Sequence, residues 1–128
     1  GVWYNPEQDG HGLNINVLDD QRMVIFWYTY DNNGNQLWLV GSGSFENDVA
    51  TLDVVSTRDA LFPPNFDADD VERADWGTFE ISFEGCDQAQ FQWNPNAGTG
   101  FTAGSMPMTR LARNAGLACD ESTDLLTQ

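Results

Sequence analysis

Residues 23–41 place the strongest constraint on how this chain can fold. Two runs rich in aromatic and β-branched residues, 23–30 and 36–41, are separated by a short polar segment that contains Asn33 and Gly34. These two residues can supply the positive φ angles that a type I′ turn requires. The pattern therefore predicts a β-hairpin with Asn33 and Gly34 as its two-residue loop.

The loop length decides which side chains share a face of the hairpin, because successive residues of a strand point to opposite sides. With a two-residue loop, Trp27 pairs with Val40. Trp38 then lies on the same face as Trp27, as its diagonal neighbour. A tight turn at residues 19–20 extends this register to a preceding strand. The predicted core face holds Leu13, Ile15, Val24, Phe26, Tyr28 and Leu39, and the opposite face holds Asn14, Asn16, Met23, Ile25, Trp27, Thr29, Trp38, Val40 and Ser42.

The rest of the chain repeats the alternation of short strands and turns. Residues 58–75 form the one long connection, and no segment has the periodicity of a helix. We therefore expect an all-β, single-domain antiparallel meander of about eight strands, with a barrel favoured over a sandwich. The β domain is predicted to span residues 1–119, followed by an acidic C-terminal tail at 120–128. The other expected strands lie near residues 1–4, 13–17, 50–56, 76–83, 89–94 and 106–111.

The charge of the chain limits its partners. It carries 20 Asp and Glu against 5 Lys and Arg, which gives a net charge of −15. Nucleic acids and anionic membrane surfaces would repel such a protein. No apolar run approaches the length that spans a membrane, so membrane insertion is not expected.

The two cysteines predict a disulfide. Cys86 lies in a turn-like segment and Cys119 near the C-terminus, without the CxxC spacing typical of metal or redox sites. A Cys86–Cys119 bond would tie the C-terminal segment to the body, contributing roughly 3.5–4 kcal/mol on the chain-entropy model. Disulfides persist in oxidising compartments, so we expect a secreted, periplasmic or cell-surface protein. The alternative is two unpaired thiols in a cytosolic protein.

Several motifs resemble known proteins. The opening GVWYNPEQDGHG, followed by WYTYD at 27–31 and WLV at 38–40, resembles an uncharacterised module of secreted proteobacterial proteins. WGT at 76–78, Cys86 and TRL at 109–111 are similar to it too, so the likeness covers most of the chain. This resemblance implies export from a bacterium and a β fold, but no chemistry. The first five residues, GVWYN, are also similar to the first strand of avidin-like barrels, which implies an avidin- or calycin-like barrel.

The inventory of reactive residues favours a protein that is not an enzyme. His11 is the single histidine and lies between two glycines. No serine lies in a Gly-x-Ser-x-Gly elbow that could complete a catalytic triad with it. A zinc site would need carboxylate or water ligands in place of the missing histidines. The enzyme alternative is a hydrolase that uses His11 with carboxylates.

Calcium is the one metal that the sequence suggests. The hard cation prefers oxygen ligands, and Asp67, Asp69 and Asp70 form a dense acidic run in the long connection. The segment at 31–35 also alternates oxygen-bearing side chains, but a hairpin turn explains it. We expect no other cofactor.

The aromatic face of the hairpin carries the functional hypothesis. Aromatic rings flanked by amides and hydroxyls suit sugar rings, which stack on the rings and hydrogen-bond to the polar groups. The leading prediction is a non-catalytic extracellular module that binds a glycan or cell-surface polymer. The alternatives are a barrel that holds a small apolar or biotin-like ligand in its lumen, a protein interface, and Trp27 and Trp38 as core residues. The candidate ligand-binding residues are Trp27, Trp38, Asn14, Asn16, Thr29, Trp3, Tyr4 and His11.

Overall fold

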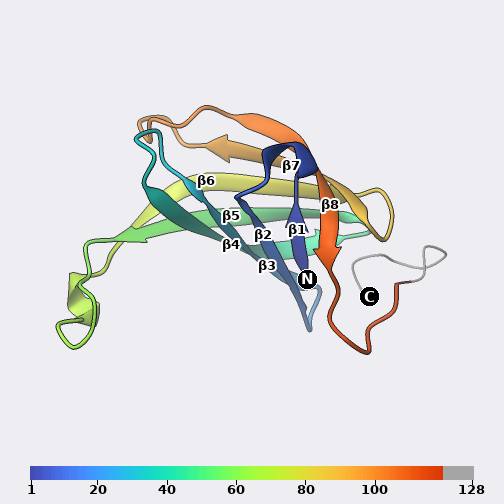
Figure 1. Cartoon of the computed structure of the whole chain (residues 1–128), viewed down its shortest axis with the longest axis horizontal. Coiled ribbons are helices and arrows are strands. Elements are labelled where there is room, and N and C mark those ends of the chain that lie inside the picture. Colours follow the sequence, from blue (N-terminus) through green and yellow to red (C-terminus); the bar gives the residue numbers. More distant parts are fainter. Residues whose placement is uncertain (120–128) are drawn as a thin grey trace.

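Eight antiparallel strands follow one another around a closed barrel in the computed structural model, which describes residues 1–119 (Figure 1). This confirms the predicted all-β barrel, and the tail at 120–128 lies outside the described residues. Two 3-10 turns, η1 (Pro6–Gln8) and η2 (Ala68–Asp70), lie in the connections. The strands are β1 (Val2–Tyr4), β2 (Gly12–Leu18), β3 (Arg22–Tyr30), β4 (Gln36–Glu46), β5 (Val49–Arg58), β6 (Glu72–Phe83), β7 (Gln88–Pro95) and β8 (Gly104–Ala112).

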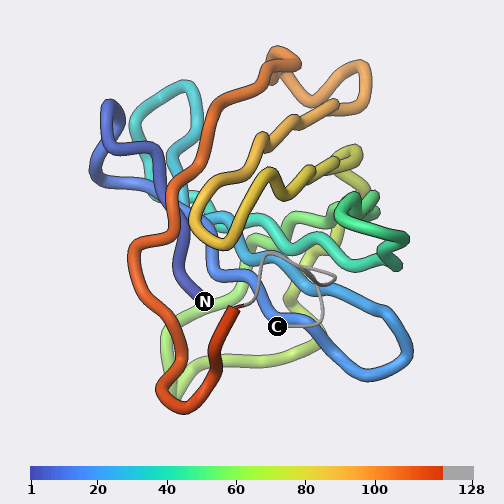
Figure 2. Tube along the Cα trace, turned by 90° about the vertical axis from the view of Figure 1, so that its right-hand side faces the viewer, coloured from blue at the N-terminus to red at the C-terminus, as the bar shows by residue number. Residues whose placement is uncertain are grey.

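The short strand β1 closes the barrel. It pairs with β2 on one side and with β8 on the other, and Figure 2 shows the first strand running beside the last. The antiparallel order places alternate connections at opposite ends. We call the end with the longer connections the mouth, and Figure 1 shows its β5–β6 connection extending away from the barrel. The mouth comprises residues 5–11, 31–35, 59–71 and 96–103, and the base comprises the short turns 19–21, 47–48 and 84–87.

The β3–β4 loop is longer than predicted. Tyr30 pairs with Gln36, so residues 31–35 all belong to the loop and the predicted two-residue turn is wrong. The reason is the side chain of Asp31, whose carboxylate oxygen accepts hydrogen bonds from the backbone N–H groups of Asn33 and Asn35, each at 2.9 Å. A loop built by such an Asx interaction competes with the type I′ turn.

The same one-residue shift occurs between β2 and β3. Asp20 and Gln21 both have positive φ, and the turn takes three residues, so Leu13 pairs with Trp27 instead of lying beside Phe26. Because the side-chain period of a strand is two, each one-residue shift moves a side chain to the other face. The predicted core positions Val24, Phe26 and Tyr28 are therefore on the outside, and Met23, Ile25 and Trp27, predicted on the opposite face, are buried in the core.

Large aromatic side chains occupy the middle of the barrel. The ring centroid of Trp27 lies 5.7 Å from Phe79 and 5.1 Å from Phe91, both in edge contacts. Gly41 makes room for this cluster, because a Cβ there would lie 2.8 Å from Cδ2 of Phe79. Trp38 stands on the outer face with 46% of its surface exposed. Trp27 and Trp38 are thus on opposite faces of the barrel wall, and the predicted pairing of the two as diagonal neighbours is wrong.

The predicted disulfide is present. Cys86, buried in the β6–β7 turn, is bonded to Cys119, which follows β8. The bond ties the C-terminal segment to the base of the barrel. Ion pairs from Arg110 and Arg113 to Asp87, at 3.4 and 2.8 Å, support the same attachment.

The two tryptophans should differ sharply in their effect on stability. We expect Trp27→Ala to lower the free energy of unfolding by about 3–5 kcal/mol, because it empties the centre of the core. Trp38→Ala should cost only about 1 kcal/mol, the order of a surface aromatic contact. Urea unfolding followed by circular dichroism measures both changes. Equal losses would contradict the observed register.

Candidate functional site

An apolar groove lies on the outer face beside the mouth. It has a volume of about 420 Å³, and Tyr4 of β1, Tyr28 of β3 and Leu111 of β8 contribute to its walls. Gly12 of β2 pairs with Tyr28 and lies against Tyr4, since a Cβ on Gly12 would be 3.5 Å from the Cβ of Tyr4. A Cβ on Gly12 would also lie 2.7 Å from the backbone oxygen of Trp3, so glycine permits the close approach of β1 and β2 beside the groove. Asn14 lines the same groove.

Aromatic rings that are at least partly exposed continue from this groove across the sheet. Phe26 and Tyr28 have nearly parallel rings, 9° apart with centroids separated by 6.3 Å, and the Trp38 ring lies 6.4 Å from Phe26. Tyr28 is 52% exposed and Trp38 46%. On β2, Asn14 pairs with Phe26, and Asn16 donates a hydrogen bond to Asn14 Oδ1 at 3.3 Å. We call this surface the outer aromatic face and define it by Tyr4, Gly12, Asn14, Asn16, Phe26, Tyr28 and Trp38.

A polar link joins the β1–β2 connection to the barrel interior. Trp27 Nε1 donates to His11 Nδ1 at 3.1 Å, and the Thr29 hydroxyl lies 3.4 Å from the same nitrogen. Because Nδ1 accepts a hydrogen bond, the proton of the neutral ring is on Nε2, 3.1 Å from Oε1 of Gln8. Burial lowers the pKa of His11, which favours this neutral form. Through these hydrogen bonds, His11 links the β1–β2 connection to the core residue Trp27.

The mouth itself contains a second, wider pocket of about 600 Å³. Leu37 of β4, Trp76 of β6 and Phe101 of the β7–β8 connection provide its apolar walls. Hydroxyl, amide and carboxylate groups from β5, β6 and the connections surround them. This pocket is separate from the outer aromatic face, because its walls come from the interior side and rim of the barrel. Its polar lining includes Ser56, Thr57, Asp75, Asn96 and Thr99.

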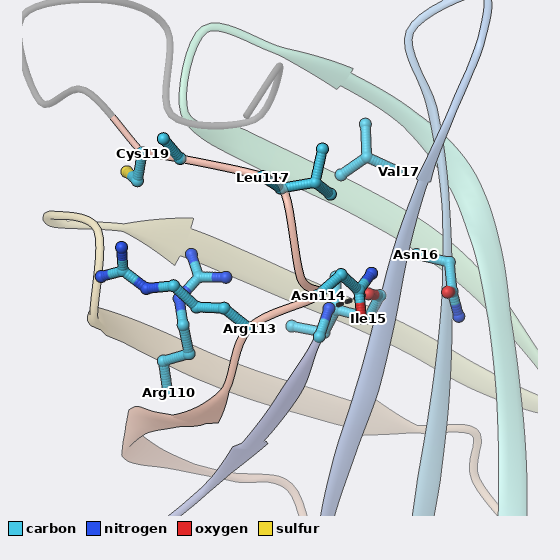
Figure 3. Close-up of a pocket in the computed structure, with 10 residues that line it drawn as sticks. Ile15, Asn16, Val17, Arg110, Arg113, Asn114, Leu117 and Cys119 are labelled. Atoms are coloured by element: carbon cyan, nitrogen blue, oxygen red, sulfur yellow. Dashed lines mark hydrogen bonds between the residues drawn. The ribbon is translucent and has the colours of Figure 1, made fainter.

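A third, small pocket of about 130 Å³ lies at the base beside the disulfide (Figure 3). Arg110 and Arg113 line it, but both side chains already have partners. Arg110 donates to the backbone oxygen of Cys86 at 2.7 Å and lies 4.7 Å from the centroid of the Trp3 ring. Arg113 is paired with Asp87. These arginines fasten the C-terminal segment, so the pocket is a consequence of that attachment.

The structure brings together some of the predicted binding residues and separates others. Tyr4, His11 and Asn14 line the outer groove, and Asn16 and Trp38 lie on the same outer face. Trp3 also touches the groove but is a core residue with 1% exposure. Trp27 and Thr29 point to the interior, where they contact His11.

Sequence reasoning missed Phe26 and Tyr28, which it assigned to the core. The available signal was Asp31, an acceptor placed two and four residues before the N–H groups that it binds. If Asp31 is taken to hold the loop by these hydrogen bonds, the register shifts by one residue and both aromatic residues are predicted on the outer face.

The acidic run in the long connection has a local structural role. Asp67 accepts a hydrogen bond from the backbone N–H of Asp69 at 3.0 Å and so caps η2, while Asp67, Asp69 and Asp70 are all exposed. Within residues 1–119, no three His, Cys, Asp or Glu side chains lie close enough to hold a metal ion. The same part of the chain has no helix with the length and apolarity needed to cross a membrane.

No protein-family model, curated protein or solved structure matches this chain. The resemblance to a secreted proteobacterial module therefore stays an expectation from its motifs.

His11 gives the fold a pH dependence that can be measured. Its pKa is lowered in the folded chain, so the unfolded chain takes up this proton at a higher pH. The His11 contribution is therefore constant well above the ordinary value of 6.5. It declines as the pH falls below that value, because the protonated ring can no longer accept from Trp27.

Urea unfolding between pH 8 and pH 5 measures this decline. His11→Gln is the control, since its amide does not titrate, and its unfolding free energy should fall less over this interval. Parallel curves for the two proteins would contradict the assignment.

Proposed function

We propose that this chain is a non-catalytic binding module of an exported bacterial protein and that its outer aromatic face binds a glycan chain. One observation carries the proposal: the groove between Tyr4 and Tyr28 continues into the half-buried ring of Phe26 and the exposed ring of Trp38. A hollow followed by a row of rings that are at least partly exposed suits an extended ligand more than a compact one.

The chemistry of the face matches a sugar polymer. The apolar face of a sugar ring can pack on an aromatic ring, while the hydroxyls at its edge form hydrogen bonds. Asn14 Oδ1 accepts from Asn16, which orients the amide, and Asn14 Nδ2 has no hydrogen-bond partner within residues 1–119. That amide nitrogen is a donor for a ligand hydroxyl. A contiguous exposed apolar surface of this kind is characteristic of interaction sites.

Electrostatics favour a neutral polymer. With a net charge of −15, the protein repels acidic polysaccharides at long range. Within the outer aromatic face, the exposed aromatic side chains are Tyr28 and Trp38, whose rings would contact a sugar ring through apolar surface. Binding should therefore depend weakly on salt, because screening alters only charged interactions.

The contacts of His11 support a role without catalysis. A general base needs a free lone pair that can reach a substrate proton, but Nδ1 accepts from Trp27 and Nε2 faces Gln8. The disulfide supports export, since such bonds persist in oxidising compartments.

A glycan array followed by calorimetry with the best ligand tests the proposal. Tyr28→Ala and Trp38→Ala should each weaken binding about tenfold, which corresponds to about 1.4 kcal/mol. Asn14→Ala should weaken it less, because it removes one hydrogen bond. All three positions are at least partly exposed, so thermal stability should change little.

Phe62→Ala is the matched control. Phe62 is an aromatic residue in the β5–β6 connection and is 88% exposed, but it does not belong to the outer aromatic face. Its removal should leave glycan binding unchanged. The proposal fails if no glycan is retained, or if Phe62→Ala weakens binding as much as Tyr28→Ala.

A further inference from the structure

Trp76 has a buried polar atom that lacks a hydrogen-bond partner. Its side chain is 4% exposed, and its Nε1 is the one buried side-chain N or O atom within residues 1–119 that has no hydrogen-bond partner. Two other tryptophans toward the same end are satisfied: Trp27 Nε1 donates to His11, and Trp93 Nε1 donates to the backbone oxygen of Thr102 at 2.9 Å. Buried donors are nearly always paired, so an unpaired indole N–H beside a pocket points to a ligand acceptor.

A β-bulge places Trp76 at the mouth. Val54 pairs with Gly77 and Val55 with Asp75, so Trp76 is an extra residue of β6 that faces no partner on β5. Bulges re-aim side chains and are common at barrel rims and next to functional sites. Gly77, which follows Trp76 in the bulge, has a φ of 152°, a backbone conformation that L side chains rarely adopt. The local backbone is thus arranged to turn an indole into the mouth pocket.

The neighbours of Trp76 form a small mixed site. Phe101 packs on it from the β7–β8 connection, with ring centroids 5.6 Å apart at 58°, and Phe79 packs on it from the core at 6.0 Å. Phe101 is itself partly exposed and lines the pocket together with Trp76.

The β7–β8 connection is held firmly against this site. Asn96 N–H donates to the Trp76 backbone oxygen at 2.7 Å, and Asn96 Nδ2 donates to the Asp75 backbone oxygen at 3.4 Å. Farther along, Asn32 Nδ2 donates to the Gly100 backbone oxygen at 2.8 Å, which joins the β3–β4 and β7–β8 connections. Figure 1 shows these two connections close together at the upper left. The pocket therefore has a preformed rim.

The charges of the lining limit the ligand. Three carboxylates, Asp31, Glu72 and Asp75, border the pocket against one guanidinium, Arg58, so an anion is disfavoured. The carboxylates would attract a cation, but an ammonium group has no lone pair with which to accept from Trp76 Nε1, so it would leave that donor unpaired. Ser56, Asn96 and Asp75 offer hydroxyl, amide and carboxylate groups to a ligand with several hydroxyls. Apolar walls and a polar rim match a ring with an apolar face and polar edges.

We propose that the mouth of the barrel is a second binding site, which takes a single uncharged polyhydroxylated ring of monosaccharide size. An oxygen of the ring accepts from Trp76 Nε1, its apolar face packs on Phe101, and its hydroxyls donate to Asp75 and Asn96. This site is independent of the outer aromatic face, because the two share none of their defining residues.

Nuclear magnetic resonance of the ¹⁵N-labelled chain tests this site directly. The signal that disappears in Trp76→Phe identifies the Trp76 indole N–H. The chain is titrated with methyl glucoside, methyl mannoside and methyl galactoside, and separately with glucuronate and with tetramethylammonium as charged probes. We expect at least one neutral glycoside to shift the Trp76 indole signal in a saturable manner, with millimolar affinity, while the charged probes leave it unchanged.

The variants separate this site from its surroundings. Trp76→Phe keeps an apolar ring but removes the donor, so the affinity read from the Phe101 and Thr99 amide signals should fall about three- to tenfold. Ser56→Ala, at the rim, should weaken binding and serves as the second variant if Trp76→Phe does not fold. Trp38→Phe makes the same chemical change on the outer face and should leave the Trp76 response intact, as should Tyr28→Ala.

Three outcomes would overturn the proposal. The first is no shift of the Trp76 signal with any neutral glycoside up to about 100 mM, far above millimolar affinity. The second is a shift with glucuronate or tetramethylammonium alone. The third is loss of the response in Trp38→Phe, which would show that the signal reports on the outer face.

Discussion

β1 pairs with β2 along one edge and with β8 along the other, so three residues join the two ends of the sheet. Trp3 anchors this closure from the inside, because its ring meets Phe83 in an edge contact at 5.3 Å and lies under the guanidinium of Arg110. Closure removes the free strand edges that would otherwise pair with other chains. It also divides the side chains of the strands into an inner and an outer set. Tyr4, the next residue along, belongs to the outer set and lines the groove.

The fold class was predictable because its signals are local. Short alternating runs, turn residues and two cysteines in loop-like settings are sufficient to indicate an antiparallel all-β domain with a disulfide. The register of the strands was not predictable in this way, because it depends on single residues in two turns. The Asp31 side chain accepts hydrogen bonds from the backbone of its own loop. Gln21 adopts a positive φ and so belongs to a turn that was predicted to contain only Asp19 and Asp20. Each of these turns shifts the strand pairing by one residue. Because side chains along a strand alternate between the two faces, a shift of one residue exchanges the inner and outer faces.

The candidate binding surfaces depend on the same details of strand pairing. An outer face rich in aromatic rings and amides was predicted in kind, with Trp38, Asn14 and Asn16 correctly on it, but Phe26 and Tyr28 take the place given to Trp27. The mouth pocket could not be predicted from the sequence, because it depends on a β-bulge. Strict alternation in β6 puts Trp76 on the face opposite Phe79, whereas both side chains are buried and in contact. A pattern of alternation carries no information about an inserted residue, and only the pairing partners reveal it.

The position of the disulfide also fixes how the module can be tethered. Gly1 and Cys119 line the same small pocket at the base, so the start of β1 and the disulfide-tied segment lie at neighbouring points. Both points are opposite the mouth, because β1 and β8 have their other ends there. A flexible linker joined at either point would leave the mouth unobstructed.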